Sequence, residues 1–167
     1  MWKETTPEEL NRNAFQMIGK DWLLVTAGTE SSCNTMTASW GGAGVMWGKD
    51  VLYLVIRPQR YTKEFIDREE RLSVCVLPET YRSVYGYLGR VSGRDEDKIS
   101  KSGLTTAFTQ GVPFFEEASV VFVCRKLFAQ PYEADSFLDS SIIEKCYPDK
   151  DYHTLYICEI EKVLTKE

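Results

Sequence analysis

Short apolar runs recur along the chain, and their lengths are those of β-strands rather than helices. The run at residues 35–40 alternates between polar and apolar side chains, which is typical of a strand with one buried face. The runs at 51–56 and 72–77 are almost entirely apolar and predict strands buried over most of their length. The predicted strands cover residues 22–27, 35–40, 51–56, 72–77, 119–128 and 153–163.

Helical patterns are fewer and shorter. A capping box at Thr6-Pro7-Glu8-Glu9 predicts a helix whose apolar face continues to Ile18 and which ends at Gly19. Further short helices are predicted at 62–69 with Thr62 as the N-cap, at 81–88, and at 95–101 with Gly103 just beyond. The glycines at 41–44 predict a turn or bulge, and residues 142–147 fit either a strand or a helix.

At least six strands with only short helices between them predict a mostly β protein, an antiparallel barrel with helical decoration. A doubly wound α/β fold would need a longer helix after each strand. The chain has 167 residues and shows no linker or internal repeat, so we expect a single domain over residues 1–167.

Composition narrows the classes of function. The formal charge of −5 argues against a nucleic-acid binder, which normally carries a basic face. The one histidine, His153, excludes metal sites built from several imidazoles, and we expect no metal. The five cysteines include no C-x-x-C pair and are expected to be free thiols, mostly buried. Without a signal peptide or a long apolar run, the chain is expected to be cytoplasmic, with no membrane contact.

The motifs of several enzyme classes are missing. The sequence has no G-x-G-x-x-G fingerprint, no P-loop of the required spacing and no G-x-S-x-G elbow. Hydrolases are therefore disfavoured, as are proteins that bind dinucleotides through a Rossmann fold.

Four clusters carry candidate chemistry, and each also has an ordinary structural interpretation. On the strand at 34–40, Thr35, Thr37 and Ser39 would present three hydroxyls on one face, with Met36, Ala38 and Trp40 on the other. Such a row suits a polar ligand with a flat ring, but an amphipathic strand with outward threonines has the same pattern.

The second cluster, at 57–62, places Arg57 and Arg60 around a turn that leads into a helix. Guanidinium groups and the free N–H groups of a helix N-terminus together form an anion site, although a solvated charged turn is the alternative. The third cluster, at 92–98, has Arg94 and Lys98 four residues apart, so both can face one ligand unless the run is a solvated helix face. In the fourth cluster, His153 is the first residue of a predicted strand. It is either a hydrogen-bonded histidine at the barrel rim or a polar group near a redox cofactor.

Taken together and in this order, the four clusters resemble the flavin reductase-like family, the FMN-binding split β-barrel proteins that include flavoredoxins. The stretches N-x-M-T-x-S-W at 34–40 and S-G-R-D-x-D-K at 92–98 carry the resemblance, with Tyr61-Thr62 between them and residues 153–157 after them. The resemblance covers roughly residues 13–163. It implies an antiparallel split β-barrel that forms a homodimer, with FMN near the subunit interface.

The resemblance also implies roles for particular residues. The strand at 34–40 would line the ribityl chain and ring, residues 57–62 would help to hold the phosphate, and residues 92–98 would add polar and cationic contacts. His153 would lie near the flavin or the entering nicotinamide. The implied FMN-binding residues are Asn34, Thr35, Met36, Thr37, Ala38, Ser39, Trp40, Arg57, Arg60, Tyr61, Thr62, Ser92, Arg94 and Lys98.

The leading hypothesis is an FMN-dependent oxidoreductase that moves electrons from NAD(P)H through bound FMN to an acceptor, without an assigned catalytic residue. The first alternative is an FMN-containing electron carrier that a partner protein reduces, for which the acidic charge would favour a basic partner surface. The second is a barrel that binds a ligand without catalysis. The sequence leaves the donor and the acceptor open.

Overall fold

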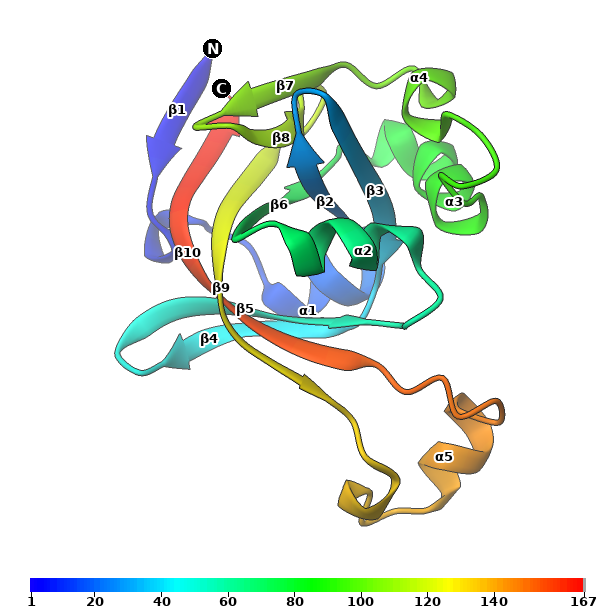
Figure 1. Cartoon of the computed structure of the whole chain (residues 1–167). Coiled ribbons are helices and arrows are strands. Elements are labelled where there is room, and N and C mark those ends of the chain that lie inside the picture. Colours follow the sequence, from blue (N-terminus) through cyan, green and yellow to red (C-terminus); the bar gives the residue numbers. More distant parts are fainter. Residues whose placement is uncertain (167) are drawn as a thin grey trace.

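The computed structural model describes residues 1–166, and its main feature is one antiparallel sheet that curves into an open barrel (Figure 1). The strands follow the order β3-β2-β6-β9-β10-β5-β4, and β1 pairs with β10. Strands β3 and β4 end the sheet and do not pair with each other, so the barrel is split as predicted. The strands are β1 (Trp2–Thr5), β2 (Leu23–Thr29), β3 (Ser32–Ala38), β4 (Gly41–Met46), β5 (Lys49–Ile56), β6 (Arg71–Val76), β7 (Thr106–Thr109), β8 (Val112–Phe115), β9 (Val120–Pro131) and β10 (Thr154–Lys166).

Short helices lie around this sheet. Helix α2 packs on β2 and β3, α3 packs on β3, and α1 contacts β4. The helices are α1 (Ala14–Gln16), α2 (Tyr61–Arg68), α3 (Arg82–Arg90), α4 (Lys98–Ser102) and α5 (Ser141–Cys146). None of the helices in residues 1–166 is long and apolar enough to cross a membrane.

Strands β2 and β6 are buried on both faces, which explains their nearly continuous apolar sequences. Leu72 and Val74 of β6 point into the barrel, whereas Cys75 belongs to a second apolar cluster on the outside of the sheet. Helix α3 and the β7–β8 hairpin contribute Leu88 and Phe114 to that outer cluster. Side chains on both faces are therefore removed from water, as the sequence predicts for this strand.

Strands β9 and β10 are long and continue beyond the barrel. Their register shifts between Ile157 and Cys158 and again between Ile160 and Lys162, and such irregularities let paired strands bend. The segments 128–131 of β9 and 154–157 of β10 extend beyond the barrel and connect it to α5 (Figure 1). We call residues 132–152 the arm. The ambiguous run at 142–147 is thus helical over most of its length, as α5.

Several predicted elements differ from the structure. The predicted helix from Pro7 to Ile18 is wrong: a short 3-10 turn at Pro7–Glu9 is separated from α1, where Asn13 caps a new start by accepting from the Gln16 N–H. The predicted turn at 41–44 is strand β4, because the glycines pair with β5 in regular register. Thr62 lies inside α2, whose N-cap is Arg60.

The charged helix predicted at 95–101 begins later, at Lys98, because the Asp97 carboxylate caps it by accepting from the Ser100 N–H. Besides β4, three strands were not predicted, namely β1 and the two strands of the β7–β8 hairpin. The hairpin turns at Gln110 and Gly111, which both have positive φ angles. Gln-Gly is a weaker turn signal than Asn-Gly or Asp-Gly.

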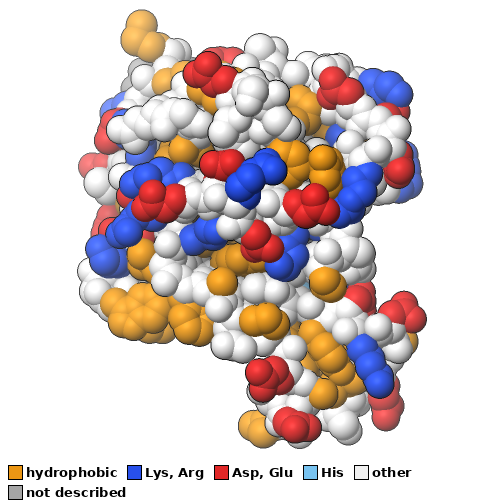
Figure 2. All heavy atoms as spheres, viewed as in Figure 1, with side chains coloured by type: hydrophobic (Ala, Val, Ile, Leu, Met, Phe, Trp, Pro, Cys, Tyr) orange, Lys and Arg blue, Asp and Glu red, His pale blue; other side chains and the backbone are white. Residues whose placement is uncertain are grey.

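Large hydrophobic side chains gather at the tip of the β4–β5 hairpin. Val45, Met46 and Trp47 are exposed there, and the Trp47 ring lies 6.4 Å from that of Phe128. Figure 2 shows hydrophobic side chains as a patch at the lower left of the barrel, over the tip of this hairpin. An apolar patch on a hairpin tip is typical of a protein–protein contact.

The burial of the barrel interior gives a direct test. Leu72 is completely buried in the barrel core, whereas Leu138 on the arm is fully exposed. We expect Leu72→Ala to lower the free energy of unfolding by about 2–5 kcal/mol, since it removes buried methyl groups and leaves a cavity. The matched variant Leu138→Ala should change it by less than about 0.5 kcal/mol in the same urea titration. Equal effects would contradict the burial described here.

Candidate functional site

Three adjoining hollows, with volumes of about 150, 380 and 320 Å³, form one groove. The groove runs past the ends of β3 and β5, the turn before α2 and the last turn of α3. Arg60 lines all three hollows and so lies at their junction. The sequence-predicted residues that line the groove are Met36, Thr37, Ala38, Ser39, Trp40, Arg57, Arg60, Tyr61, Thr62, Ser92, Lys98 and His153.

Two cations without an acidic partner occupy one end of the groove. Lys98 is 3% exposed, and its Nζ donates to the carbonyl oxygens of Leu88 and Val91, both at 2.8 Å. Because an ammonium group has three donors, one remains for a ligand. Arg60 Nη1 donates to the Gly89 carbonyl at 2.6 Å. Within residues 1–166 no carboxylate forms an ion pair with either cation.

The electrostatics of this end favour an anion. Burial, and then the nearby Arg60, lower the pKa of Lys98 to about 8. Burial and the neighbouring Arg57 lower the pKa of Arg60. A positive charge that is removed from water and placed near another is costly until a negative group joins it. The two side chains are therefore arranged for an anionic ligand.

A third donor comes from Thr62, on the first turn of α2. Thr62 is buried, and its Oγ1 accepts a hydrogen bond of 2.9 Å from Asn34 Nδ2. Since this bond uses an acceptor position, the hydroxyl proton of Thr62 can still be donated to a ligand. The first N–H groups of α2, at Tyr61 and Thr62, have no acceptor within the helix and carry the positive end of its dipole.

Gly93 fixes the position of Asn34 from behind. A Cβ at Gly93 would lie 2.4 Å from Asn34 Oδ1 and 3.1 Å from the Tyr61 ring, so only glycine fits beside them. Asn34 itself lies behind Thr62 and does not line the groove. Its contact with the site is through the Thr62 hydroxyl.

Arg57 connects the groove to the arm. Its Nη1 forms an ion pair with Asp151 Oδ2 at 2.7 Å, and its Nη2 donates to the Cys146 carbonyl at 3.0 Å. Gln59 donates to the same Asp151 oxygen, and this bond together with Arg57 lowers the pKa of the carboxyl. The charge of Arg57 is thus largely neutralised by the arm, unlike that of Arg60.

The opposite end of the groove is aromatic. The His153 ring lies 5.3 Å from the Trp40 ring, and its Nδ1 is 2.7 Å from the Tyr147 hydroxyl oxygen. Burial, followed by the charge of Arg57, lowers the pKa of His153 to about 4. At neutral pH the histidine is therefore uncharged, and the charge at this hollow comes from Arg57, which Asp151 neutralises, and from Arg60.

The predicted row of three ligand-facing hydroxyls is wrong for Thr35. Thr35 is completely buried, and its Oγ1 bonds Thr26 Oγ1 at 2.9 Å and the Val25 carbonyl at 3.2 Å. The Thr37 hydroxyl donates to the Tyr85 carbonyl at 2.6 Å, although Thr37 lines the groove. Ser39 is exposed there. The strand twists into the barrel, so its first hydroxyl faces the neighbouring strand.

Arg94 does not meet Lys98 at the groove. It forms an ion pair with Glu64, donates to the Gln59 carbonyl at 3.1 Å and lies over the Tyr61 ring. The helix that would have brought Arg94 and Lys98 onto one face starts only at Lys98. Arg94 therefore stabilises the outside of the turn that presents Tyr61.

Sequence reasoning missed other residues of the groove, above all Arg90 and Gly89 at the end of α3. The sequence pattern that could have predicted them is the helical spacing of four apolar or aromatic residues, Tyr81, Val84, Tyr85 and Leu88. A buried face at those positions leaves positions 86, 89 and 90 on the side of the helix turned toward the groove.

Comparison with known families agrees with this geometry. The family model for the flavin reductase like domain matches residues 17–167. The chain belongs to the flavin reductase-like family. The predicted family and the predicted split barrel are therefore confirmed. No curated protein matches the chain in sequence.

Solved structures of this family have the same fold. An FMN-binding domain of a flavin reductases-like enzyme from Shewanella baltica superposes with a TM-score of 0.71 and 18% identity, covering 99% of this chain and 77% of that one. Flavoredoxin from Methanosarcina acetivorans gives 0.67 and 21%, covering 98% and 77%. The flavin reductase of styrene monooxygenase from Pseudomonas putida gives 0.64 and 17%, covering 88% and 80%.

The single histidine makes the aromatic end of the groove easy to test. We expect its ring signals in proton NMR of the folded protein to titrate with a midpoint near pH 4, because burial and Arg57 oppose protonation. In urea the same ring should titrate near pH 6.5. Since the folded pKa is the lower one, the contribution of His153 to stability is complete above about pH 6.5 and declines as the pH falls toward 4. A folded-state midpoint above 6 would contradict the burial described here.

Proposed function

We propose that the protein is an FMN-binding oxidoreductase of the flavin reductase/flavoredoxin type, which moves electrons from NAD(P)H through bound FMN to an acceptor. The observation that carries the proposal is the groove itself, with an uncompensated cationic end and an end lined by aromatic rings. FMN has the same polarity, a phosphate at one end and a flat ring at the other. Membership of the family and likeness to FMN-binding proteins support the same cofactor.

The cationic end suits the phosphate of FMN. Arg60 and the remaining donor of Lys98 would neutralise it, and the Thr62 hydroxyl and the first N–H groups of α2 would donate to its oxygens. Tyr61 and Ser92 border this end. Burying the charges of Arg60 and Lys98 without a negative partner costs free energy. A bound phosphate would offset this cost because it supplies the missing negative charge.

The middle of the groove suits the ribityl chain, and the far end suits the ring. Met36, Thr37 and Ala38 line the middle, with Ser39 able to donate a hydrogen bond. Trp40 and His153 would lie against the flavin ring or the entering nicotinamide. FMN, when bound, supplies the redox chemistry by accepting a hydride from NAD(P)H and passing electrons to the acceptor. Because His153 is uncharged, this end offers no strong acid, and none is needed for hydride transfer.

A homodimer would cover the exposed apolar tip of the β4–β5 hairpin, where Trp47 and Phe128 meet. The five cysteines are all free, as is typical of a reducing compartment, and a cytoplasmic location fits them. We also propose that residues 1–167 form one flavin reductase-like domain.

A second candidate is an FMN-containing electron-transfer protein that a partner protein reduces, without its own NAD(P)H activity. The likeness to flavoredoxin and the net charge of −5 favour it, because an acidic surface suits a basic redox partner.

The electron donor separates the two candidates. Under anaerobic conditions, we expect NADH or NADPH to bleach the flavin absorbance of the FMN-loaded protein within seconds to minutes. Free FMN at the same concentration is the control for reduction in solution. Bleaching by dithionite but by neither nucleotide would favour the electron carrier over the oxidoreductase. Failure to bind FMN at all would contradict both.

The phosphate end gives a second test, in which riboflavin is the control ligand because it lacks the phosphate. Charged hydrogen bonds contribute about 1.5–3 kcal/mol each. We therefore expect the double variant Arg60→Ala/Thr62→Ala to weaken FMN binding at least 100-fold in a fluorescence titration. Riboflavin affinity should change little. The control variant Arg94→Ala removes a nearby arginine outside the groove and should leave FMN affinity within twofold. Equal losses for FMN and riboflavin would place the phosphate elsewhere.

A further inference from the structure

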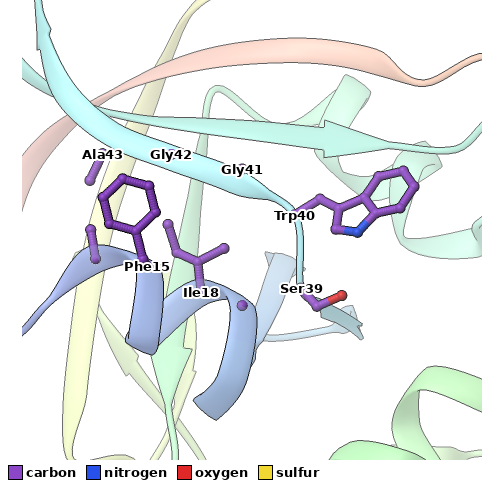
Figure 3. Close-up of a pocket in the computed structure, with 9 residues that line it drawn as sticks. Phe15, Ile18, Ser39, Trp40, Gly41, Gly42 and Ala43 are labelled. Carbon is purple, nitrogen blue, oxygen red and sulfur yellow. The ribbon is translucent and has the colours of Figure 1, made fainter. Parts of the chain in front are cut away.

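A separate apolar slot adjoins the aromatic end of the groove. It has a volume of about 410 Å³ and lies between α1 and the start of β4 (Figure 3). Ser39 and Trp40 line both the slot and the groove. The remaining lining residues are Ala14, Phe15, Ile18, Gly19, Gly41, Gly42 and Ala43. None of the nine lining residues is charged, whereas the groove is lined by Arg57 and Arg60.

The slot exists because of the residues on its two walls. On one wall β4 contributes Gly41, Gly42 and Ala43, so no side chain larger than a methyl group rises from the strand. On the other wall α1 presents Phe15 and the turn after it presents Ile18, both facing the strand in Figure 3. Phe15 is 88% exposed although it is a large apolar side chain. An exposed aromatic ring opposite a strand without bulky side chains forms an apolar surface on which a flat ligand can pack.

Polar groups at the slot are few. The Ser39 hydroxyl forms no hydrogen bond with the described residues, and in Figure 3 it points away from Phe15. The Trp40 indole points away from Phe15 in Figure 3, toward the groove. A ligand in the slot would therefore lie beside the aromatic end of the groove without sharing its cationic end.

We propose that this slot binds a neutral, planar aromatic compound of the quinone class, with its ring on Phe15. The uncharged lining favours a neutral ligand over the anions that the groove attracts. The volume exceeds what one or two fused rings need, and lies within the range of small-molecule sites. The continuity through Ser39 and Trp40 explains why such a ligand would be placed next to the flavin site.

The role of this ligand rests on the proposed function, in which it is the electron acceptor. A quinone, NAD(P)H and one proton from solvent give a hydroquinone and NAD(P)⁺, with two electrons passing through FMN. Binding itself does not require that role, and the experiment below measures binding.

The probe is 2,3-dimethyl-1,4-naphthoquinone, whose substituted ring carbons do not add to free thiols. We expect saturable binding by calorimetry to the apoprotein and to the FMN-loaded protein, in the absence of any reductant. Phe15→Ala should weaken binding about tenfold, since it removes the stacking partner. Because Phe15 is exposed, this variant should keep the melting temperature of the wild type. Ala43→Leu, which fills the slot from the opposite wall, should weaken binding as strongly.

Phe128→Ala is the matched control, since it removes another partly exposed phenylalanine that does not line the slot, and its affinity should equal that of the wild type. Absence of saturable binding, or an unchanged affinity in Phe15→Ala, overturns the proposal. Competition between FMN and the quinone would show that the slot holds the flavin ring instead. Dissociation of a dimer by Ala43→Leu at unchanged quinone affinity would assign the face to a second copy. If the protein binds no FMN, the proposed function fails, and the apoprotein titration still decides the slot.

Discussion

The organisation of the groove depends on two cations that the protein removes from water without giving either a carboxylate. Lys98 is held by the carbonyl oxygens of Leu88 and Val91, and Arg60 by that of Gly89. All three carbonyls belong to the end of α3 and the residue after it. That helix end is therefore tied to the turn before α2 and to α4 by side chains whose charges remain uncompensated. The arrangement costs stability in the empty protein, and an anionic ligand would recover it.

The turn before α2 carries two arginines with different roles. Arg57 and Arg60 are three residues apart, but Arg57 is neutralised by Asp151 of the arm, whereas Arg60 is not. The arm is thus attached beside the groove through Arg57, Gln59 and the contact of Tyr147 with His153. One arginine anchors the arm and the other is left for a ligand. His153, in the ring-lined end next to the arm, is uncharged at neutral pH because burial and Arg57 lower its pKa.

Part of the site could be predicted because local sequence places it. The helix start after Arg60 brings Tyr61 and Thr62 to an N-terminus, and such an end attracts anions wherever it occurs. The hydroxyl row on β3 was predicted less well, since strand alternation says which residues share a face but not what covers that face. Thr26 and the barrel interior cover Thr35, and the Thr37 hydroxyl donates its hydrogen bond to the Tyr85 carbonyl. Arg94 was misplaced because a capping aspartate, Asp97, begins the helix three residues later.

The amino-acid sequence by itself determined six of the strands and the helices α2 and α3, because apolar periodicity is a local property. Its ordered motifs carried the resemblance that implied the family and the split barrel. Only the tertiary structure decided which charges stay uncompensated, since this depends on carboxylates distant in sequence, such as Asp151 for Arg57 and Glu64 for Arg94. It also turned the glycines at 41–44 into an edge strand, because β5 offered them a regular register. Phe15 of α1 faces that edge strand and borders a slot that no local sequence pattern predicts.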